Sequence, residues 1–349
     1  MSCDPVDLRN LTPLEILEVV RSLGGTVHQG ERMVRAVLRD GAKTLPDIPI
    51  ARRIRERLPN RYYLSSVTVR NHLHSKDGSE KFLYELPDGE QVEGVLIPDG
   101  NRITLCISTQ VGCRSGCAFC LSGSQGWQRN LQSSEMLGQV HAARKATGKV
   151  ADNLVLMGSG EPLDNFENVK RFAETATDRL GLNISPRKIT ISTSGLIPGI
   201  RKMTRELPVS LAVSLNAPDN ELRNRLMPIN RKYPLKDLLD TLRSWCHGGK
   251  RVFIEYILFS TVNDSPEHAR QLVDQLAGLR CVVNLLPFNE YPGAPFTRPP
   301  EERVRAFQKV LLDSGLISVV RDSRGTDIMA ACGQLRAGRA EADFSCTSD

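Results

Sequence analysis

From residue 101 onward, short apolar segments alternate with longer segments of helical periodicity, and this alternation restricts the fold more than any other feature of the chain. Short strands separated by helices predict β/α units with parallel strands, because each helix returns the chain to the same end of the sheet. We predict strands over residues 103–108, 153–157, 188–192, 209–214, 251–259, 282–287 and 317–321. We predict helices over residues 134–146, 165–180, 235–246, 266–279 and 301–312. Six or seven such units predict an α/β fold of the partial (β/α) barrel type.

Polar and glycine-rich segments follow most of the predicted strands. A cysteine-rich loop follows the first strand, residues 158–162 follow the second, and polar residues end the third, fourth and sixth strands. In β/α barrels, the loops after the carboxyl ends of the strands build the active site. The sequence therefore predicts one site assembled from segments that lie far apart in the chain.

Three cysteines, Cys113, Cys117 and Cys120, occur in the first of these loops with the spacing C-x3-C-x2-C. Three thiolates can ligate three irons of a [4Fe-4S] cluster and leave the fourth iron open to bind another molecule. The alternative is structural zinc, but such sites usually close their shell with four ligands. The chain has no second C-x2-C pair and no histidine between residues 75 and 140. The spacing therefore favours an iron–sulfur cluster with one open iron.

Composition excludes several classes of protein. Hydrophobic residues make up 40% of the chain and charged residues 25%, which is ordinary for a globular protein. We expect no membrane span and no secretory signal, because no apolar run is long enough and the first residues lack the basic and apolar regions of a leader. Nine mostly unclustered cysteines fit a reducing cytoplasm, and a net charge of +6 is compatible with a nucleic-acid partner.

Periodicity divides the chain into four parts. The first is helical, with helices predicted over residues 12–23, 31–39 and 50–58, and we expect it to be an accessory domain that binds RNA. Its basic residues 51–57 form either a solvated surface or a phosphate contact. The second part alternates apolar and polar residues between turn signals and predicts a β-ribbon. The four parts are residues 1–60, the β-ribbon connector 61–100, the barrel 101–335 and a polar tail 336–349.

Beyond the cysteine motif, a series of short motifs occurs in order between residues 76 and 335. They are EGVLIP (93–98), LCISTQVGC (105–113), QGWQRNL (125–131), GSGEP (158–162), SLNAPD (214–219), MPIN (227–230), NDS (263–265), LPFN (286–289) and AACGQL (330–335). In this order they resemble the RlmN/Cfr family of radical-SAM RNA (adenine) methyltransferases. Over some three quarters of the chain, the resemblance implies a radical-SAM barrel and an enzyme that methylates an adenosine of RNA.

The resemblance implies a covalent mechanism. An adenine ring carbon cannot attack the methyl group of S-adenosylmethionine (SAM), whereas a cysteine thiolate can. Cys332 matches the cysteine that is methylated first. A second SAM is then cleaved at the cluster, and the resulting radical activates the methyl group for addition to the base. Cys106 matches the thiol that resolves the protein–RNA adduct by forming a disulfide with Cys332, and Glu93 matches the base that removes the ring proton.

The resemblance also implies the cofactors and their binding residues. One [4Fe-4S] cluster is held by the three motif cysteines, and SAM binds beside it. Gly160 lets the backbone approach SAM, and the Glu161 carboxylate pairs with its ammonium group. The other positions that match the SAM pocket are Ser192, Ser214, Leu215, Asn216 and Asn289. Phe119 is expected to pack over the cluster.

The expected target is C2 of an adenosine in 23S rRNA, and also in tRNA. Pro162 resembles the C2-methylating branch, whereas the C8-methylating branch usually has alanine there. The chain departs from the family pattern at Ser159, where methionine is usual, and at Asn216, where some members have histidine. Candidates for phosphate contacts near the barrel mouth are Arg114, Arg129, Lys188, Arg201, Lys202, Arg321 and Arg324.

The expected partners are RNA and an electron donor such as flavodoxin or ferredoxin, and we expect a monomer in the cytoplasm. Three alternatives remain open at this point. The chain could methylate C8 of adenosine, or it could keep the radical chemistry and act on another substrate. It could also be a non-catalytic RNA-binding scaffold with a structural cluster or zinc.

Overall fold

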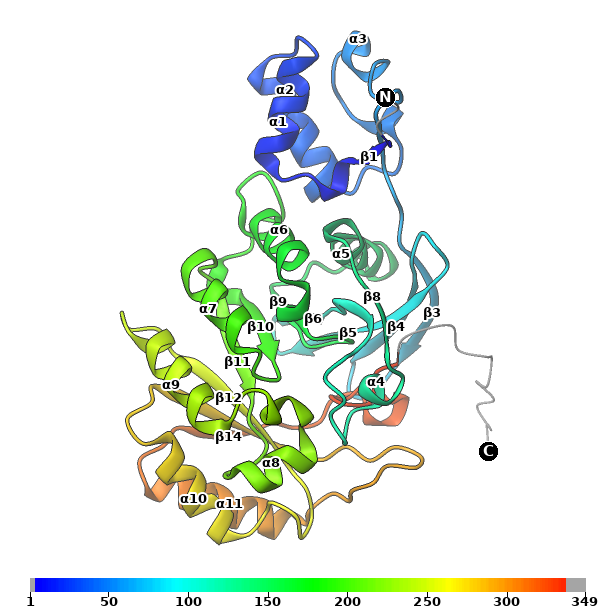
Figure 1. Cartoon of the computed structure of the whole chain (residues 1–349). Helices are drawn as coiled ribbons and strands as arrows, with labels where there is room; N and C mark the ends of the chain where they lie inside the picture. The colour runs from blue at the N-terminus through cyan, green and yellow to red at the C-terminus, as the bar shows by residue number, and fades with distance from the viewer. Residues whose placement is uncertain (1–3, 337–349) are drawn as a thin grey trace, which may run out of the picture.

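The computed structural model describes residues 4–336. Its centre is a ten-stranded sheet in the order β14-β13-β12-β11-β10-β9-β6-β5-β4-β3. Figure 1 shows this sheet with helices around its outer side and a small helical domain at one end of the molecule. Of the predicted tail, residues 336–349, only Arg336 is among the described residues.

The seven strands from β6 to β14 pair in parallel and confirm the predicted barrel. Their bounds are β6 Arg102–Cys106, β9 Asn153–Leu156, β10 Ile189–Thr193, β11 Ser210–Ser214, β12 Val252–Leu258, β13 Cys281–Pro287 and β14 Ser318–Val320. Along β12, every second residue is fully buried, and the residues between them are partly accessible. The fully buried set packs into the main hydrophobic core, so the other set faces the inside of the barrel.

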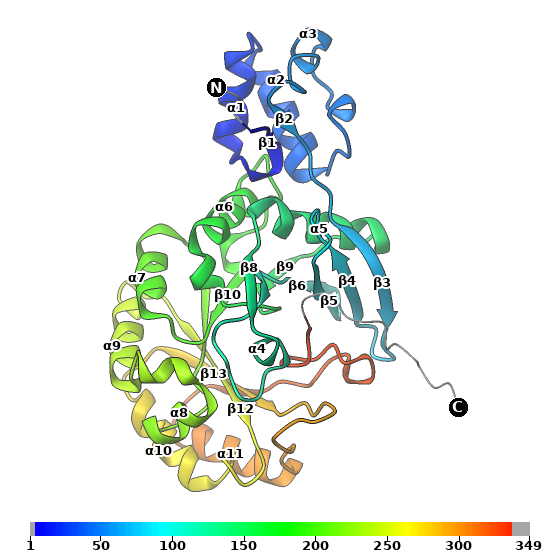
Figure 2. The ribbon, with the colours of Figure 1, turned by 45° about the vertical axis from the view of Figure 1, so that its right-hand side comes forward.

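The helices that connect the strands cover the outer face of the sheet (Figures 1 and 2). All five predicted helices are present, as α5 Ser133–Thr147, α6 Phe166–Thr177, α9 Leu235–Cys246, α10 Pro266–Leu276 and α11 Glu301–Asp313. Two more, α7 Ile197–Glu206 and α8 Asn220–Leu226, were not predicted. Pro198 and Gly199 suggest a turn, but proline fits the first turn of a helix, and Gly199 lets α7 approach Leu163 closely.

The predicted β-ribbon consists of β3 Thr68–His74, β4 Glu80–Glu85 and β5 Gln91–Asp99. These strands pair antiparallel with one another, and β5 also pairs antiparallel with β6. The ribbon therefore continues the barrel sheet, and one row of paired residues runs from Lys81 through Val95 and Cys106 to Val155.

The N-terminal domain contains α1 Pro13–Ser22, α2 Val27–Val34 and the short α3 Arg52–Arg55. Thr12 and Glu15 form a capping box at the start of α1, which lies within the helix predicted over residues 12–23. A second capping box at Thr26 starts α2 earlier than predicted, and a π-helical turn extends it to Arg39. The domain contacts the barrel through polar bonds, including an ion pair of 2.6 Å between Glu15 and Arg171 on α6. Within residues 4–336, no helix is long and apolar enough to cross a membrane.

Candidate active site

The motif cysteines lie in a loop at the carboxyl end of β6. The hairpin of β7 Gln110–Gly112 and β8 Trp127–Asn130 encloses the loop, and the short helix α4 Leu121–Ser124 follows the third cysteine. The amide of Cys113 donates to Gly126 O at 2.9 Å, and the amide of Ala118 donates to Leu226 O at 2.9 Å. These bonds fix the loop at both ends and hold its thiols at the barrel mouth.

The three thiols suit a cluster better than a single ion. The pKa of Cys113 is raised to about 11 and the pKa of Cys117 well above its usual range. Burial is the largest cause of both shifts, and neighbouring motif thiols contribute to both. Structural zinc sites usually close their shell with four ligands, whereas among the described residues this loop offers three cysteines. Phe119 packs with Cys117 and Cys120 in an apolar cluster at the mouth. The donor set therefore fits three irons of a larger group in an apolar surrounding.

The segment that carries Cys332 lies against the cysteine loop. It follows β14 and contacts α4, as Figures 1 and 2 show. The amide of Leu121 donates to Gly333 O at 2.9 Å, and the Ser122 hydroxyl donates to Leu335 O at 2.7 Å. Two segments about 210 residues apart in the chain are thus joined directly at the mouth.

Cys332 itself is accessible to solvent, yet the walls of the mouth surround its thiol. This desolvation, and secondly the Glu255 carboxylate, raise the pKa of the Cys332 thiol to about 11. Arg321 opposes the shift, and Cys120 adds to it, so the thiol lies within electrostatic range of the cysteine loop. Asn289, another predicted residue, donates weakly from Nδ2 to Cys332 O at 3.5 Å.

Cys106 ends β6 below the Cys332 segment. Its side chain is buried and packs in one cluster with Val95, Ala330 and Leu335. Burial, and secondly the Cys332 thiol, raise the pKa of Cys106 to about 12. Both cysteines are free thiols. The structure therefore places Cys106 beside the segment of Cys332, the two cysteines that the family resemblance pairs.

Glu93 lies on β5 in the same region. Its Oε1 forms an ion pair of 2.9 Å with Lys81 Nζ, and its Oε2 accepts from the amide of Arg336 at 2.8 Å. Burial raises the pKa of the Glu93 carboxyl, and Lys81 lowers it. The Ser108 hydroxyl donates to Glu93 O at 2.7 Å, which ties this part of β5 to the end of β6.

Gly160 and Glu161 form a tight turn after β9. Gly160 has φ +110°, and a Cβ there would lie 2.8 Å from the backbone nitrogen of Gln110. The Glu161 carboxylate is buried and accepts from the Ser194 amide and hydroxyl, each at 2.7 Å, and from the Leu163 amide at 3.1 Å. The carboxylate thus holds the neighbouring turns of the mouth together.

Replacing Gly160 by alanine should therefore weaken SAM binding by about tenfold or more, because the Cβ would meet backbone and the positive φ adds strain. Gly148→Ala is the matched control, since Gly148 also has a positive φ (+71°) but its Cβ would have nothing within 4 Å. Titration calorimetry of SAM with both cluster-loaded variants makes the comparison. Equal affinities would show that the turn after β9 tolerates a side chain.

Three further predicted positions of the SAM pocket lie at the carboxyl ends of β10, β11 and β13. Ser192 on β10 and Ser214 on β11 are partly accessible, whereas the residues beside them in each strand are buried. Asn289 follows β13, and its Oδ1 accepts from Arg298 Nη1 at 3.3 Å. The parallel register places these polar groups around one opening.

Leu215 and Asn216, the last two predicted positions of the SAM pocket, are completely buried. Asn216 Oδ1 accepts from the Ile257 amide at 2.8 Å, and Nδ2 contacts Met227 Sδ at 3.3 Å. The backbone at Asn216 is left-handed, with φ +59°, a conformation that asparagine tolerates well. The Asn216 side chain therefore fixes the loop after β11, and contact with SAM there stays a prediction.

Arg223 on α8 is a buried residue of the mouth that sequence reasoning missed. Its guanidinium donates to Leu215 O, Ser194 O, Ser214 O and Asn230 Oδ1 at 2.7–3.1 Å. Burial lowers its pKa to about 10. One side chain thus donates hydrogen bonds to the carbonyl groups at the carboxyl ends of β10 and β11. Two of the predicted SAM positions, Ser192 and Ser214, lie at these ends.

We expect Arg223→Met to lower the free energy of unfolding by about 3 kcal/mol, because it leaves several buried oxygen atoms without a donor. Arg225→Met on the same helix is the control, since Arg225 is exposed. Urea unfolding followed by circular dichroism measures both. A loss of less than about 0.5 kcal/mol in Arg223→Met would contradict a structural role for these bonds.

Contrary to the prediction from the sequence, the candidate phosphate contacts do not all lie near the barrel mouth. Arg114, Arg321 and Arg324 lie at the mouth, in the cysteine loop and after β14, whereas Lys188 precedes β10 at the opposite end of the strands. Arg129 is held by two carboxylates, Asp88 at 2.8 Å and Glu135 at 2.8 Å. Its role in RNA binding stays a prediction.

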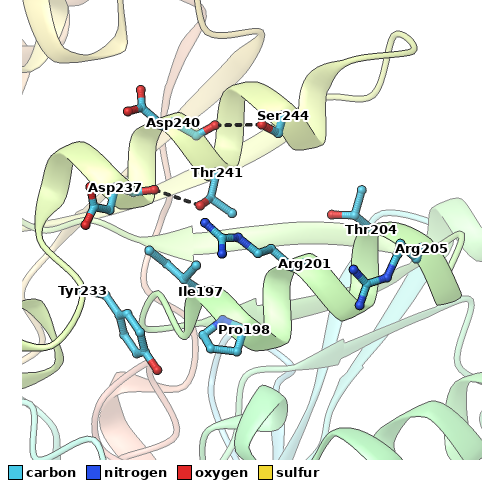
Figure 3. Close-up of a pocket in the computed structure, with 10 residues that line it drawn as sticks. All are labelled: Ile197, Pro198, Arg201, Thr204, Arg205, Tyr233, Asp237, Asp240, Thr241 and Ser244. Carbon is cyan, nitrogen blue, oxygen red and sulfur yellow. Dashed lines mark hydrogen bonds between the residues drawn. The ribbon is translucent and has the colours of Figure 1, made fainter.

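Arg201 and Lys202 lie on α7, in the outer helical layer. Arg201 lines a groove of about 600 Å³ between α7 and α9, together with Tyr233 and Asp240 (Figure 3). Lys202 pairs with Glu167 at 3.1 Å. None of the predicted active-site residues lines this groove, so it is separate from the barrel mouth.

Comparison with known proteins gives consistent matches. Residues 107–273 match the Radical SAM superfamily. The chain is 45% identical over 336 residues to the dual-specificity RNA methyltransferase RlmN of Syntrophotalea carbinolica, covering 95% of this chain and 90% of the relative. It is 41% identical to the RlmN of Syntrophus aciditrophicus, with 96% and 97% covered. A radical SAM methyltransferase structure from Sphaerobacter thermophilus superposes with a TM-score of 0.89 at 40% identity, over 95% of this chain and 99% of that one.

Proposed function

Because this chain belongs to the RlmN family of radical-SAM RNA methyltransferases, we propose that it methylates C2 of an adenosine in 23S rRNA and in tRNA through a methylated Cys332. The observation that carries this proposal is the meeting of Cys106 and the Cys332 segment beside the cysteine loop. A non-catalytic scaffold has no need for two further thiols at the mouth of such a site.

Cys113, Cys117 and Cys120 would hold a [4Fe-4S] cluster, and the turn at Gly160 with the polar strand ends of β10, β11 and β13 would hold SAM. When bound, these groups supply the methyl group, the carbon radical and a one-electron acceptor. Phe119 and the apolar cluster around it keep water from the reacting atoms.

The roles of the protein residues follow from their positions. In the covalent adduct, a methylene carbon joins Cys332 Sγ to C2 of the base. Glu93 takes the C2 proton, and the electron pair of that C–H bond stays in the ring. The Cys106 thiolate then attacks Cys332 Sγ, so that an S–S bond forms and the S–C bond breaks. The electron pair of the broken bond takes up a proton at the methylene carbon, which becomes the methyl group of the product.

The remaining parts of the proposal concern partners. Mouth residues Arg114, Arg321 and Arg324 offer positive charge to RNA phosphates, and residues 4–60 form a separate domain beside the barrel that we propose also contacts RNA. A small redox protein such as flavodoxin or ferredoxin would reduce the cluster. We propose that the enzyme acts as a monomer in the cytoplasm.

The test is an assay of the cluster-loaded protein with methyl-labelled SAM and unmodified ribosomal or transfer RNA. After digestion, mass spectrometry identifies the labelled nucleoside against standards. Label in 2-methyladenosine is the expected result. Label in 8-methyladenosine would assign the chain to the other branch, and SAM consumption without any labelled adenosine would mean that the substrate is different.

A further inference from the structure

We propose that Lys81 is a positioning residue that keeps Glu93 ionised and directs its carboxylate toward the segment that carries Cys332. This inference rests on the proposed function for the role of Glu93. Its own evidence is the set of contacts that Lys81 makes between β4, β5 and the last described segment.

Lys81 is a lysine in an unusual place. Its side chain is only 6% exposed, although an ammonium group normally stays in water unless it is paired. Lys81 pairs with Val95, and Val95 pairs with Cys106, so Lys81 lies in the same row of the sheet as the resolving thiol. The two residues are two strands apart, or roughly 10 Å along the row. Lys81 therefore lies on the same face of the sheet as Cys106, toward the inside of the barrel.

The ammonium group of Lys81 has two partners within hydrogen-bonding distance. Lys81 Nζ lies 2.9 Å from Glu93 Oε1 and donates to Met329 O at 3.0 Å. Met329 is three residues before Cys332, and the amide of Arg336 binds the second oxygen of the same carboxylate at 2.8 Å. Lys81 and Glu93 thus hold the Cys332 segment on both sides of the cysteine.

Electrostatics give this arrangement a chemical consequence. A buried carboxyl tends to be neutral, and a neutral carboxyl cannot accept the ring proton. The charged groups that face Glu93 are Lys81 on β4 and Arg336 on the last segment, and both lower the pKa of the carboxyl. On β6, Ser108 binds the carbonyl of Glu93 and carries no charge. Lys81 is the closer charge because it contacts the carboxylate directly.

Removing the Lys81 charge raises the pKa of Glu93, so a larger fraction of Glu93 is protonated at neutral pH. The step that needs the ionised carboxylate then slows at low and neutral pH and recovers as pH rises. Methylation of Cys332, which precedes any role of Glu93, should be much less affected.

The experiment compares cluster-loaded Lys81→Met, Lys81→Gln and Lys81→Arg with the unchanged enzyme. Lys145→Met is the control for loss of one positive charge, because Lys145 is exposed on α5. Intact-protein mass spectrometry reports methylation of Cys332, and nucleoside analysis reports RNA methylation across pH 6–9. Lys81→Gln keeps a hydrogen-bond donor and serves if Lys81→Met does not fold.

We expect Lys81→Met and Lys81→Gln to retain methylated Cys332 while RNA methylation at pH 7 falls roughly 100-fold. We also expect the acid limb of the pH profile to move to higher pH, and Lys81→Arg to restore most of the activity. The inference is overturned if the pH profile does not move, or if both half-reactions fall together as a general loss of structure would cause. Failure of the proposed function is distinguishable, since the unchanged enzyme would then fail to methylate RNA.

Discussion

Replacing Cys332 by alanine is expected to abolish RNA methylation, with a loss on the order of 10⁴-fold or more. The reason is chemical, because the ring carbon cannot attack SAM and no other thiol takes the place of Cys332. Within the described residues, the thiols outside the mouth are Cys246 on α9 and Cys281, which begins β13 at the opposite end of the barrel. Nucleoside mass spectrometry with labelled SAM measures the loss.

Two features of Cys332 ensure that this substitution tests the chemistry of the thiol and not the stability of the fold or of the cluster. Cys332 is solvent-accessible, so its truncation removes little packing and should leave the fold intact. The iron content and the visible absorption of the cluster should be unchanged, because Cys332 is not one of the three motif cysteines. Cys246→Ala is the matched control and should keep full activity. If Cys332→Ala methylated RNA at a normal rate, the methyl group would not pass through this thiol.

The architecture of the barrel was predictable because it depends on local patterns. Apolar strands alternate with amphipathic helices, and a right-handed parallel arrangement then places all polar strand ends at one mouth. Helix α7 escaped prediction because Pro198 and Gly199 look like a turn, whereas here they begin a helix that packs closely on Leu163.

Site residues could be predicted from the sequence only where a local motif indicates their chemical role. The cysteine spacing indicated a cluster, but the sequence offered no reason to select Arg223, which looks like an ordinary charge in NELRNRL. The ion pair of Lys81 with Glu93 was equally hidden, because it depends on a diagonal contact between β4 and β5 and on a segment about 250 residues later. Such pairs are set by strand register and tertiary packing, which local patterns do not encode.

Replacing Cys106 by alanine should have the second large effect, which is to trap the enzyme on its RNA. Without the resolving thiol, the S–C bond of the adduct cannot be broken by disulfide formation. We expect product to fall to roughly 1% or less and a covalent protein–RNA species to accumulate. Denaturing gels before and after nuclease digestion detect the species, and mass spectrometry of the digested peptide locates the nucleotide on Cys332.

The unchanged enzyme provides the complementary test of the same step. In the adduct, Cys332 Sγ is bonded to carbon and carries no charge, but burial still raises the pKa of Cys106 above its usual range. The Cys106 thiolate is therefore a minor species at neutral pH. The thiolate fraction grows about tenfold for each pH unit below that pKa, so decay of the adduct in a single turnover should accelerate as pH rises. Cys106→Ala should show no such acceleration, since it has no thiol to ionise. Adduct that decays equally fast in both proteins would assign its resolution to a group other than Cys106.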